Sequence, residues 1–414
     1  MNESSKKTGR YVLGGAVALG LFIILAWFAF REGPSSPEHR PVKVEPTKPH
    51  AQPGAPAFEP VDGSPSAELT NRPNDSVATN AAVIYRQAFD LFDALSKEQK
   101  TIVGDWRTNV DASAEAELCG KIRPICDLMH QASAVTNCDW GIDPIDFDTK
   151  FPHLGAARNL ARAAVWSAAH CRSNDAAGAT DDAVSVLRLG RTVSQTVMLG
   201  SLVDMAIQSI AVSYVAPNLG MFHGAEGQRL ASALNDPAYG ESPARAMERE
   251  AEMVDRLAAK LATLPPTDAG NELSRELGSA DGESISPDQL ANFLAGTKEV
   301  ADLERGLAKV LRSSSEEEYE AWHTRFDELQ EGSNLAAMLL LPAYDRYVDR
   351  VQRAEVTRTL VEAGLAVAEG GTEALAAHPD PASGKPFVYT KTDNGFELQS
   401  SYQLNDKPMK MQFK

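Results

Sequence analysis

Four cysteines, Cys119, Cys126, Cys138 and Cys171, could form covalent cross-links in this sequence. An even number of cysteines in an exported body suggests disulfides. If Cys119 and Cys126 lie on one unbroken helix, about 10 Å separates their Cα atoms, which is too far for a disulfide. Each would then need Cys138 or Cys171, although Pro124 leaves that premise open. We predict at least one disulfide; buried free thiols and a zinc site are the alternatives.

Four carboxylates follow Cys138 within ten residues: Asp139, Asp143, Asp146 and Asp148. Calcium takes six to eight oxygen ligands, so this loop is a candidate calcium site. The spacing differs from that of an EF-hand loop, and aspartates beside prolines commonly cap helices and turns. We therefore favour a structural role for these four aspartates and expect no cofactor.

The sequence lacks the short motifs that identify common enzymes. The histidines are scattered, and no H-E-x-x-H, G-x-S-x-G or phosphate-binding loop occurs. A catalytic triad can still assemble from distant residues. The pattern favours a protein without catalytic activity, with an enzyme as the alternative.

The net charge of -17 is carried entirely by the part of the chain after residue 75. Residues 1–75 hold eight basic and eight acidic residues, whereas the remainder holds 32 and 49. A body this acidic repels phosphate backbones. We therefore expect no nucleic-acid partner.

Residues 11–30 form a run of 20 residues without a charged side chain. At about 1.5 Å per residue, a helix of this length spans a membrane core of about 30 Å. Lys6, Lys7 and Arg10 precede it, so residues 1–10 are predicted to stay in the cytoplasm and the body to face the periplasm. A cleaved signal peptide is the alternative, but the apolar run is long and lacks a small-x-small site.

Residues 31–75 are rich in proline and contain almost no aliphatic periodicity. Such a segment cannot bury enough apolar surface to offset the entropy of folding. We predict a disordered linker that separates the membrane helix from the body.

Residues 76–376 are predicted to form a multi-helix, bundle-like body. Apolar stripes and caps indicate helices near residues 80–95, 118–129, 154–168 and 181–215, the last bent at Gly200. Ser96 with Gln99 matches a capping box for a short following turn. Ser-Pro pairs predict helix starts at Ser242 and Ser286, the second with a capping box completed by Gln289. Further helices are predicted from Ser315 and over residues 334–369, the last stopped by Gly370-Gly371. Residues 265–285 are predicted to be a surface loop.

Residues 377–414 are predicted to form a small β-element. Residues 387–389 and 396–398 alternate with a period of two, and Asp393-Asn394-Gly395 between them is a strong hairpin signal. Residues 409–413, after Asn405-Asp406, can add a third strand. Because a two-stranded ribbon is marginal alone, it must pack on the helices.

The C-terminal tail also carries a recognisable pattern, DP-x-SG-KP-x-x-Y followed by GF-x-L-x-S. Its matching positions are Asp380, Pro381, Gly384, Pro386, Tyr389, Gly395, Phe396 and Ser400. This tail, with the segments NAAVIYRQAF and CDWGID, resembles uncharacterised membrane-anchored helical proteins of Planctomycetes-type bacteria. The tail is similar, more distantly, to the β-tail of type II secretion pseudopilins, although no pilin-type processing site precedes Tyr11. The resemblance implies an architecture and a cell-envelope setting.

These observations together predict a single-pass protein of the bacterial inner membrane. Its periplasmic helical body is expected to be an interaction module for a protein partner in the envelope. The alternatives are an envelope-polymer hydrolase, with the four aspartates as the first residues to test, and an accessory component of a secretion or pilus-like system.

Overall fold

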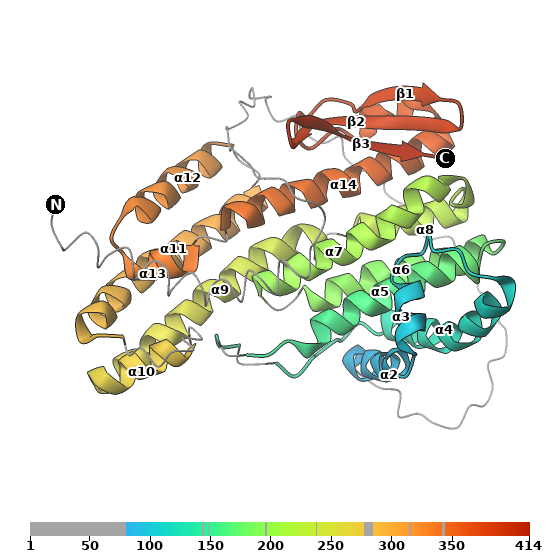
Figure 1. Cartoon of the computed structure of the whole chain (residues 1–414). Coiled ribbons are helices and arrows are strands. Elements are labelled where there is room, and N and C mark those ends of the chain that lie inside the picture. Colours follow the sequence, from blue (N-terminus) through green and yellow to red (C-terminus); the bar gives the residue numbers. More distant parts are fainter. Residues whose placement is uncertain are drawn as a thin grey trace, which may run out of the picture.

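The computed structural model describes residues 80–142, 145–147, 149–194, 197–236, 238–276, 285–313, 316–341 and 344–414. Two helical lobes lie end to end, and a small β-sheet rests on one of them (Figure 1). The predicted fold class, an α-rich body with a C-terminal β-element, is confirmed. The predicted membrane helix and linker lie outside the described residues.

The first lobe contains the N-terminal helices and one large core. Its helices are α2 (Ala81–Asp93), α3 (Lys97–Val103), α4 (Ala112–Ser133), α5 (Pro152–His170), α6 (Ala176–Val193), α7 (Met198–Val215), η1 (Ala216–Met221) and α8 (Ala225–Leu234). Asn80 caps α2, and Ser96 with Gln99 forms the capping box that the sequence predicts for α3. Alanines on the buried side of α5 let α6 and α7 approach closely.

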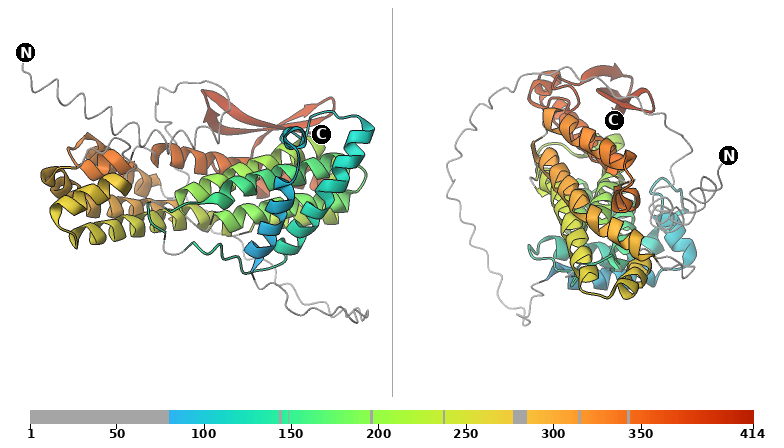
Figure 2. Two further views of the ribbon diagram at one scale, coloured as in Figure 1. Left: turned by 60° about the horizontal axis from the view of Figure 1, so that its bottom comes forward. Right: turned by 90° about the vertical axis from the view of Figure 1, so that its left-hand side faces the viewer.

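The second lobe has a separate core and extends away from the first. It consists of α9 (Ala238–Ala262), α10 (Pro266–Glu276), α11 (Pro287–Ser313), α12 (Glu316–Glu331) and α13 (Leu335–Leu340). The long helices α9 and α11 pack along each other, as two further views show (Figure 2). Ser286 and Gln289 form the second predicted capping box.

Helix α14 (Tyr344–Gly370) joins the two lobes because its side chains enter both cores. Tyr344, Tyr347 and Val348 belong to the core of the second lobe, whereas Val356 and Leu360 belong to that of the first. The helix ends at Gly370, before Gly371 with a φ of 73°, as the Gly-Gly pair predicts. The short helix η3 (Thr372–Ala377) then leads to the sheet.

The sheet consists of three antiparallel strands in the order β1 (Val388–Thr392), β2 (Gly395–Leu404) and β3 (Lys407–Phe413). The predicted hairpin turn is confirmed, with Thr392 opposite Gly395. Asn405 and Asp406 both have positive φ angles, which the second tight turn requires. Phe413 closes the sheet onto α14 at Gly364, where a Cβ atom would lie 2.4 Å from the Phe413 ring.

Several helix boundaries differ from the sequence prediction. The pattern over residues 181–215 is two helices rather than one bent at Gly200: α6 ends at Val193, and α7 begins at Met198, whose N–H donates to the Glu250 carboxylate. Helix α9 begins before Pro243 and continues through it. Helix α4 also continues through Pro124. In each case tertiary packing overrides the local signal.

Residues 266–276 form helix α10, so the predicted surface loop over residues 265–285 is wrong for this part. Ala269 and Leu273 bury the apolar side of this short helix against the second core. Pro266 occupies the first turn, where its missing N–H costs nothing. The composition of the segment is polar, and this concealed its amphipathic pattern.

Among the described residues, one helical stretch, Met198–Met221, is long and apolar enough to cross a membrane. Helix α7 within this stretch packs against α5, α6, α9 and α14, and 56% of the apolar window is buried. More than half of this apolar window is therefore buried in the core. Length and composition alone are weak evidence for a membrane span.

Candidate functional site

A disulfide joins Cys119 on α4 to Cys171, the residue that ends α5, with Cα atoms 5.6 Å apart. Since α4 is unbroken, Cys119 and Cys126 lie on one helix, and Cys119 pairs with Cys171, one of the two partners that this helix geometry leaves open. Cys126 and Cys138 are free thiols, the first buried and the second half-buried. At least one disulfide was predicted, and the structure contains this pair.

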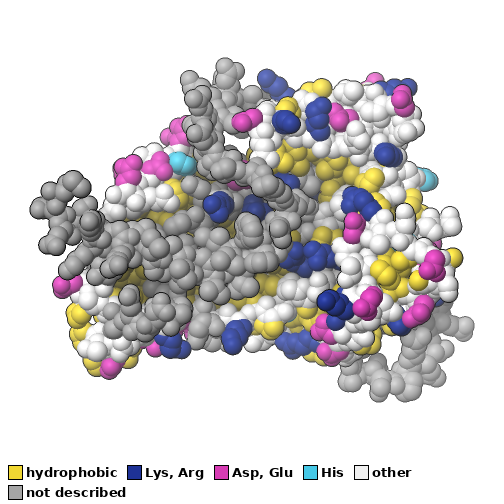
Figure 3. Space-filling model, viewed as in Figure 1, with side chains coloured by type: hydrophobic (Ala, Val, Ile, Leu, Met, Phe, Trp, Pro, Cys, Tyr) yellow, Lys and Arg dark blue, Asp and Glu magenta, His cyan; other side chains and the backbone are white. Residues whose placement is uncertain are grey.

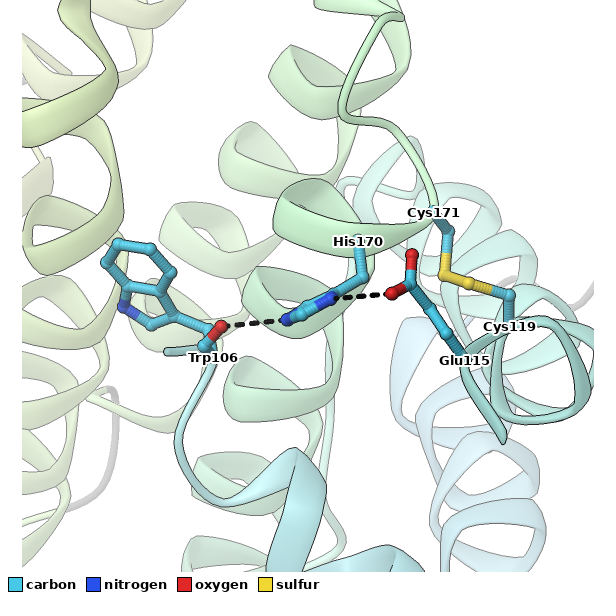
Figure 4. Close-up of a disulfide and its surroundings, with 5 residues drawn as sticks. All are labelled: Trp106, Glu115, Cys119, His170 and Cys171. Carbon is cyan, nitrogen blue, oxygen red and sulfur yellow. Dashed lines mark hydrogen bonds and ion pairs between the residues drawn. A yellow bond between two sulfur atoms is a disulfide. The ribbon is translucent and has the colours of Figure 1, made fainter. Parts of the chain in front are cut away.

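His170 lies beside the disulfide, and each of its ring nitrogens contacts another residue (Figure 4). Nε2 donates to the Trp106 carbonyl oxygen at 2.9 Å, and Nδ1 lies 3.5 Å from a Glu115 carboxylate oxygen. The ring also stacks on Trp166, with centroids 4.6 Å apart. These contacts fix the start of α4 against the end of α5, so His170 has a structural role.

The two free thiols are poor nucleophiles because their surroundings disfavour the thiolate. Burial raises the pKa of Cys126 well above its usual range, and the nearby charge of Asp182 raises it further. Burial also raises the pKa of Cys138 to about 11. A reactive cysteine requires the opposite, an exposed and electropositive environment.

The described aspartates after Cys138 make separate contacts and do not converge on one site. Asp139 accepts a hydrogen bond from the Gly141 N–H at 2.8 Å, and Asp146 pairs with Arg256 at 3.5 Å. Asp143 and Asp148 lie outside the described residues. The two visible members thus hold a turn and an ion pair, and the described ranges contain no group of three or more His, Cys, Asp or Glu arranged to hold a metal.

The structure brings together a histidine and an aspartate that sequence reasoning did not connect. His130 near the end of α4 and Asp182 on α6 are 52 residues apart, and His130 Nε2 lies 2.8 Å from Asp182 Oδ1. Asp182 is fully buried, whereas the His130 side chain retains 27% of its exposed area. Hydrogen bonding and the charge of Asp182 outweigh the effect of burial and raise the His130 pKa.

His130 lines a pocket of about 600 Å³ between α4, α6 and α8. Hydrogen-bonding groups predominate among its side chains: His130, Ser133, Asp181, Arg188, Gln228, Arg229 and Ser232, with Ala134, Val184 and Ala225 between them. Arg229 is paired with Asp181 across the pocket and with Glu226. The volume falls within the range of ordinary small-molecule sites.

A second group of titratable side chains lies buried where the lobes meet. Tyr344 of α14 donates to Glu304 of α11, and Tyr347 of α14 donates to Ser201 of α7 at 3.0 Å. Burial raises the pKa of Glu304 well above its usual range and that of Glu250 to about 7. These contacts connect three helices of the two lobes.

The sequence contains little that points to either group, because both are assembled from separate helices. Asp181 and Asp182 lie at the start of the apolar pattern over residues 181–215, and His130 is one of several scattered histidines. Comparison with protein-family models, with curated proteins and with solved structures found no match to this chain. The geometry of the α4–α6–α8 pocket alone therefore makes it the candidate site.

Proposed function

We propose that this chain is a single-pass protein of the bacterial inner membrane whose periplasmic helical body is an interaction module. Residues 11–30 anchor it, and residues 31–75 hold the body away from the membrane. The Cys119–Cys171 disulfide supports this setting, since disulfides persist in oxidising compartments. Tethering raises the effective concentration of the body towards membrane-bound partners.

The observation that carries the binding role is the α4–α6–α8 pocket. It is a recess lined by arginine, histidine, serine and glutamine side chains, with Ala134, Val184 and Ala225 between them. Such groups fix the orientation of a bound molecule. Cys126 is buried, Cys138 is half-buried, and His170 is fully engaged, so the described side chains here suit recognition more than covalent chemistry.

A photo-crosslinking amino acid at Ser232 tests the binding role in native membranes. Ser232 is exposed at the pocket, and Lys298, with a side chain 84% exposed on α11, is the matched control position. We expect one reproducible adduct from position 232 and none of the same mass from position 298. Identical adduct patterns at the two positions contradict a specific binding role for the pocket.

A secretion-accessory role is a narrower form of the same proposal. It rests on the likeness of the tail to pseudopilin β-tails. Identification of the Ser232 adduct as a component of a secretion or pilus-like assembly supports it, and a partner of any other kind argues against it.

An envelope-polymer hydrolase is the second candidate, and the His130–Asp182 pair favours it. A buried carboxylate that orients a half-exposed imidazole is the arrangement of a general base. Removing such a base slows a reaction by about 100-fold or more. The full chain in detergent, incubated with purified peptidoglycan, tests this, with His130→Gln compared with His323→Gln on α12. Equal turnover by the two variants excludes His130 as the base.

A further inference from the structure

Cationic side chains gather at the α4–α6–α8 pocket, although the body as a whole is acidic. The chain has a net charge of -17, yet the pocket lining contains Arg188, Arg229 and His130 against one carboxylate, Asp181. Arg229 already forms ion pairs with Asp181 and Glu226. The positive character available to a ligand therefore comes mainly from Arg188 and His130.

Arg188 is exposed, and its hydrogen bond within the described part of the chain goes to a backbone carbonyl. Its Nη1 lies 3.3 Å from the Ser133 carbonyl oxygen, and no described carboxylate pairs with it. A guanidinium has five N–H donors in a planar fork that matches carboxylate and phosphate oxygens. Most of these donors remain for a ligand.

His130 can supply a second donor from another helix. Asp182 engages Nε2, so Nδ1 is the ring nitrogen that a ligand can reach from the pocket. When the ring is protonated, Nδ1 carries a hydrogen and donates to an anionic oxygen. The buried carboxylate behind the ring stabilises that protonated form.

The opposite wall of the pocket, on α8, presents neutral hydrogen-bonding groups. The side chains of Gln228 and Ser232 make no hydrogen bond to other described residues, and both line the pocket. Helix α8 also begins here, at Ala225, and no side chain caps its first turn. Free N–H groups at a helix start favour oxygen-rich ligands, although Glu226 in the same turn offsets part of the dipole.

We infer that the pocket binds a small hydroxylated molecule of the sugar class that carries one carboxylate or phosphate group. Arg188 and His130 hold the anionic group, while Gln228 and Ser232 bind hydroxyl groups. The volume of about 600 Å³ is larger than an isolated phosphate needs and accommodates a sugar ring. This inference names the ligand of the proposed interaction module and rests on that proposal.

Isothermal titration of the purified full chain in detergent with four probes tests this ligand class. Glucuronate and glucose 6-phosphate distinguish carboxylate from phosphate, glucose tests the need for charge, and inorganic phosphate tests the need for a ring. We expect one charged sugar to bind, glucose to give no measurable binding, and phosphate to bind at least about tenfold more weakly.

Two variants of this chain locate the binding. Arg188→Gln is expected to weaken binding of the charged sugar at least about tenfold, since it removes the bidentate donor. Arg346→Gln, an exposed arginine of α14 in the other lobe, is the matched control and should leave affinity unchanged. Ser232→Phe fills the pocket without removing a charge and should also abolish binding.

The inference is wrong if neither charged sugar binds, if glucose binds as tightly as they do, or if Arg188→Gln behaves like Arg346→Gln. The Ser232 photo-adduct separates this failure from failure of the proposed function. A specific adduct without sugar binding leaves the interaction module in place and rejects only the ligand class. Absence of both rejects the module as well.

Discussion

Glu304 of α11 has 1% of its surface exposed, and its Oε2 atom has no hydrogen-bond partner in the described structure. Tyr344 donates to the other oxygen. Burial raises the pKa of Glu304 well above its usual range, and the charge of Glu250 raises it further. A carboxyl group whose pKa is raised by folding contributes stability below its unfolded pKa, near 4.5, and that contribution is lost as the pH rises through the folded pKa. Stability should therefore fall from pH 5 towards pH 8.

Glu304→Gln is expected to raise the free energy of unfolding at pH 8 by roughly 1–3 kcal/mol, with a much smaller gain at pH 5. The amide removes the buried charge and still accepts the Tyr344 hydrogen bond. Urea unfolding at the two pH values measures the difference. Asp302→Asn, at an exposed ion pair with Lys298, is the control and should give no gain at pH 8. An equal effect of Glu304→Gln at both pH values would show that its ionisation does not limit stability.

At the scale of elements, the Cys119–Cys171 disulfide joins two helices over a sequence separation of 52 residues. By loop-closure entropy, a cross-link of this length contributes roughly 4 kcal/mol. Cys119→Ser should therefore lower the free energy of unfolding by about that amount, whereas Cys138→Ser at a free, half-buried thiol should have a small effect. Thiol titration of denatured, unreduced protein should count two free thiols. A count of four rejects the cross-link.

One carboxylate, Asp380, connects the segment before β1 to strand β2. It accepts hydrogen bonds from Ser400 and Ser401 on β2 at 2.8 Å and from the Ala382 N–H at 3.1 Å. These bonds outweigh the effect of burial and lower the Asp380 pKa, so its contribution to stability is lost as the pH falls through the folded pKa. The contacts give a physical reason for the Asp-Pro-x-Ser-Gly pattern of the tail.

Asp380→Ala is expected to destabilise the sheet by roughly 2–4 kcal/mol, because it leaves the buried Ser400 hydroxyl and the N–H groups of Ala382 and Ser401 without their acceptor. Limited proteolysis followed by mass spectrometry measures this as faster cleavage between residues 380 and 414. Asp393→Ala in the exposed hairpin turn is the control and should be cleaved like the wild type. Equal cleavage of the two variants would mean that the sheet is held by its apolar contacts with α14 alone.

At the scale of the whole molecule, two cores share helix α14 and the contacts around Tyr344 and Tyr347. The lobes are therefore coupled through buried hydrogen bonds as well as apolar packing. In the space-filling view, several Lys and Arg side chains lie in the middle of the visible face, and others lie along its upper and lower edges (Figure 3).

The proposed orientation places the N-terminus in the cytoplasm and the body in the periplasm. A reporter that is active only in the cytoplasm, fused after Lys414, should give little signal, and an alkaline phosphatase fusion at the same position should be active. The positive residues before residue 11 predict this orientation. A strong cytoplasmic signal would reverse the topology and remove the environment that favours the Cys119–Cys171 disulfide.

Local signals in the sequence predicted the structure correctly where residues a few positions apart determine the backbone conformation. Capping boxes at Ser96 and Ser286 and the turn at Asp393 depend on hydrogen bonds and φ angles within a few residues. Segments whose local pattern was ambiguous were misread. Helix α10 is polar by composition, and helix α9 passes through Pro243, since packing in the second core stabilises both.

The sequence by itself determined the fold class, the acidic charge of the body and the hairpin, because these follow from composition and short-range periodicity. Only the tertiary structure decided which cysteine meets Cys119, that His130 meets Asp182, and that Glu304 is buried beside Tyr344. Each of these pairs is separated by 40 residues or more along the chain. Their proximity results from how helices pack, and helix packing depends on the whole core rather than on any one segment.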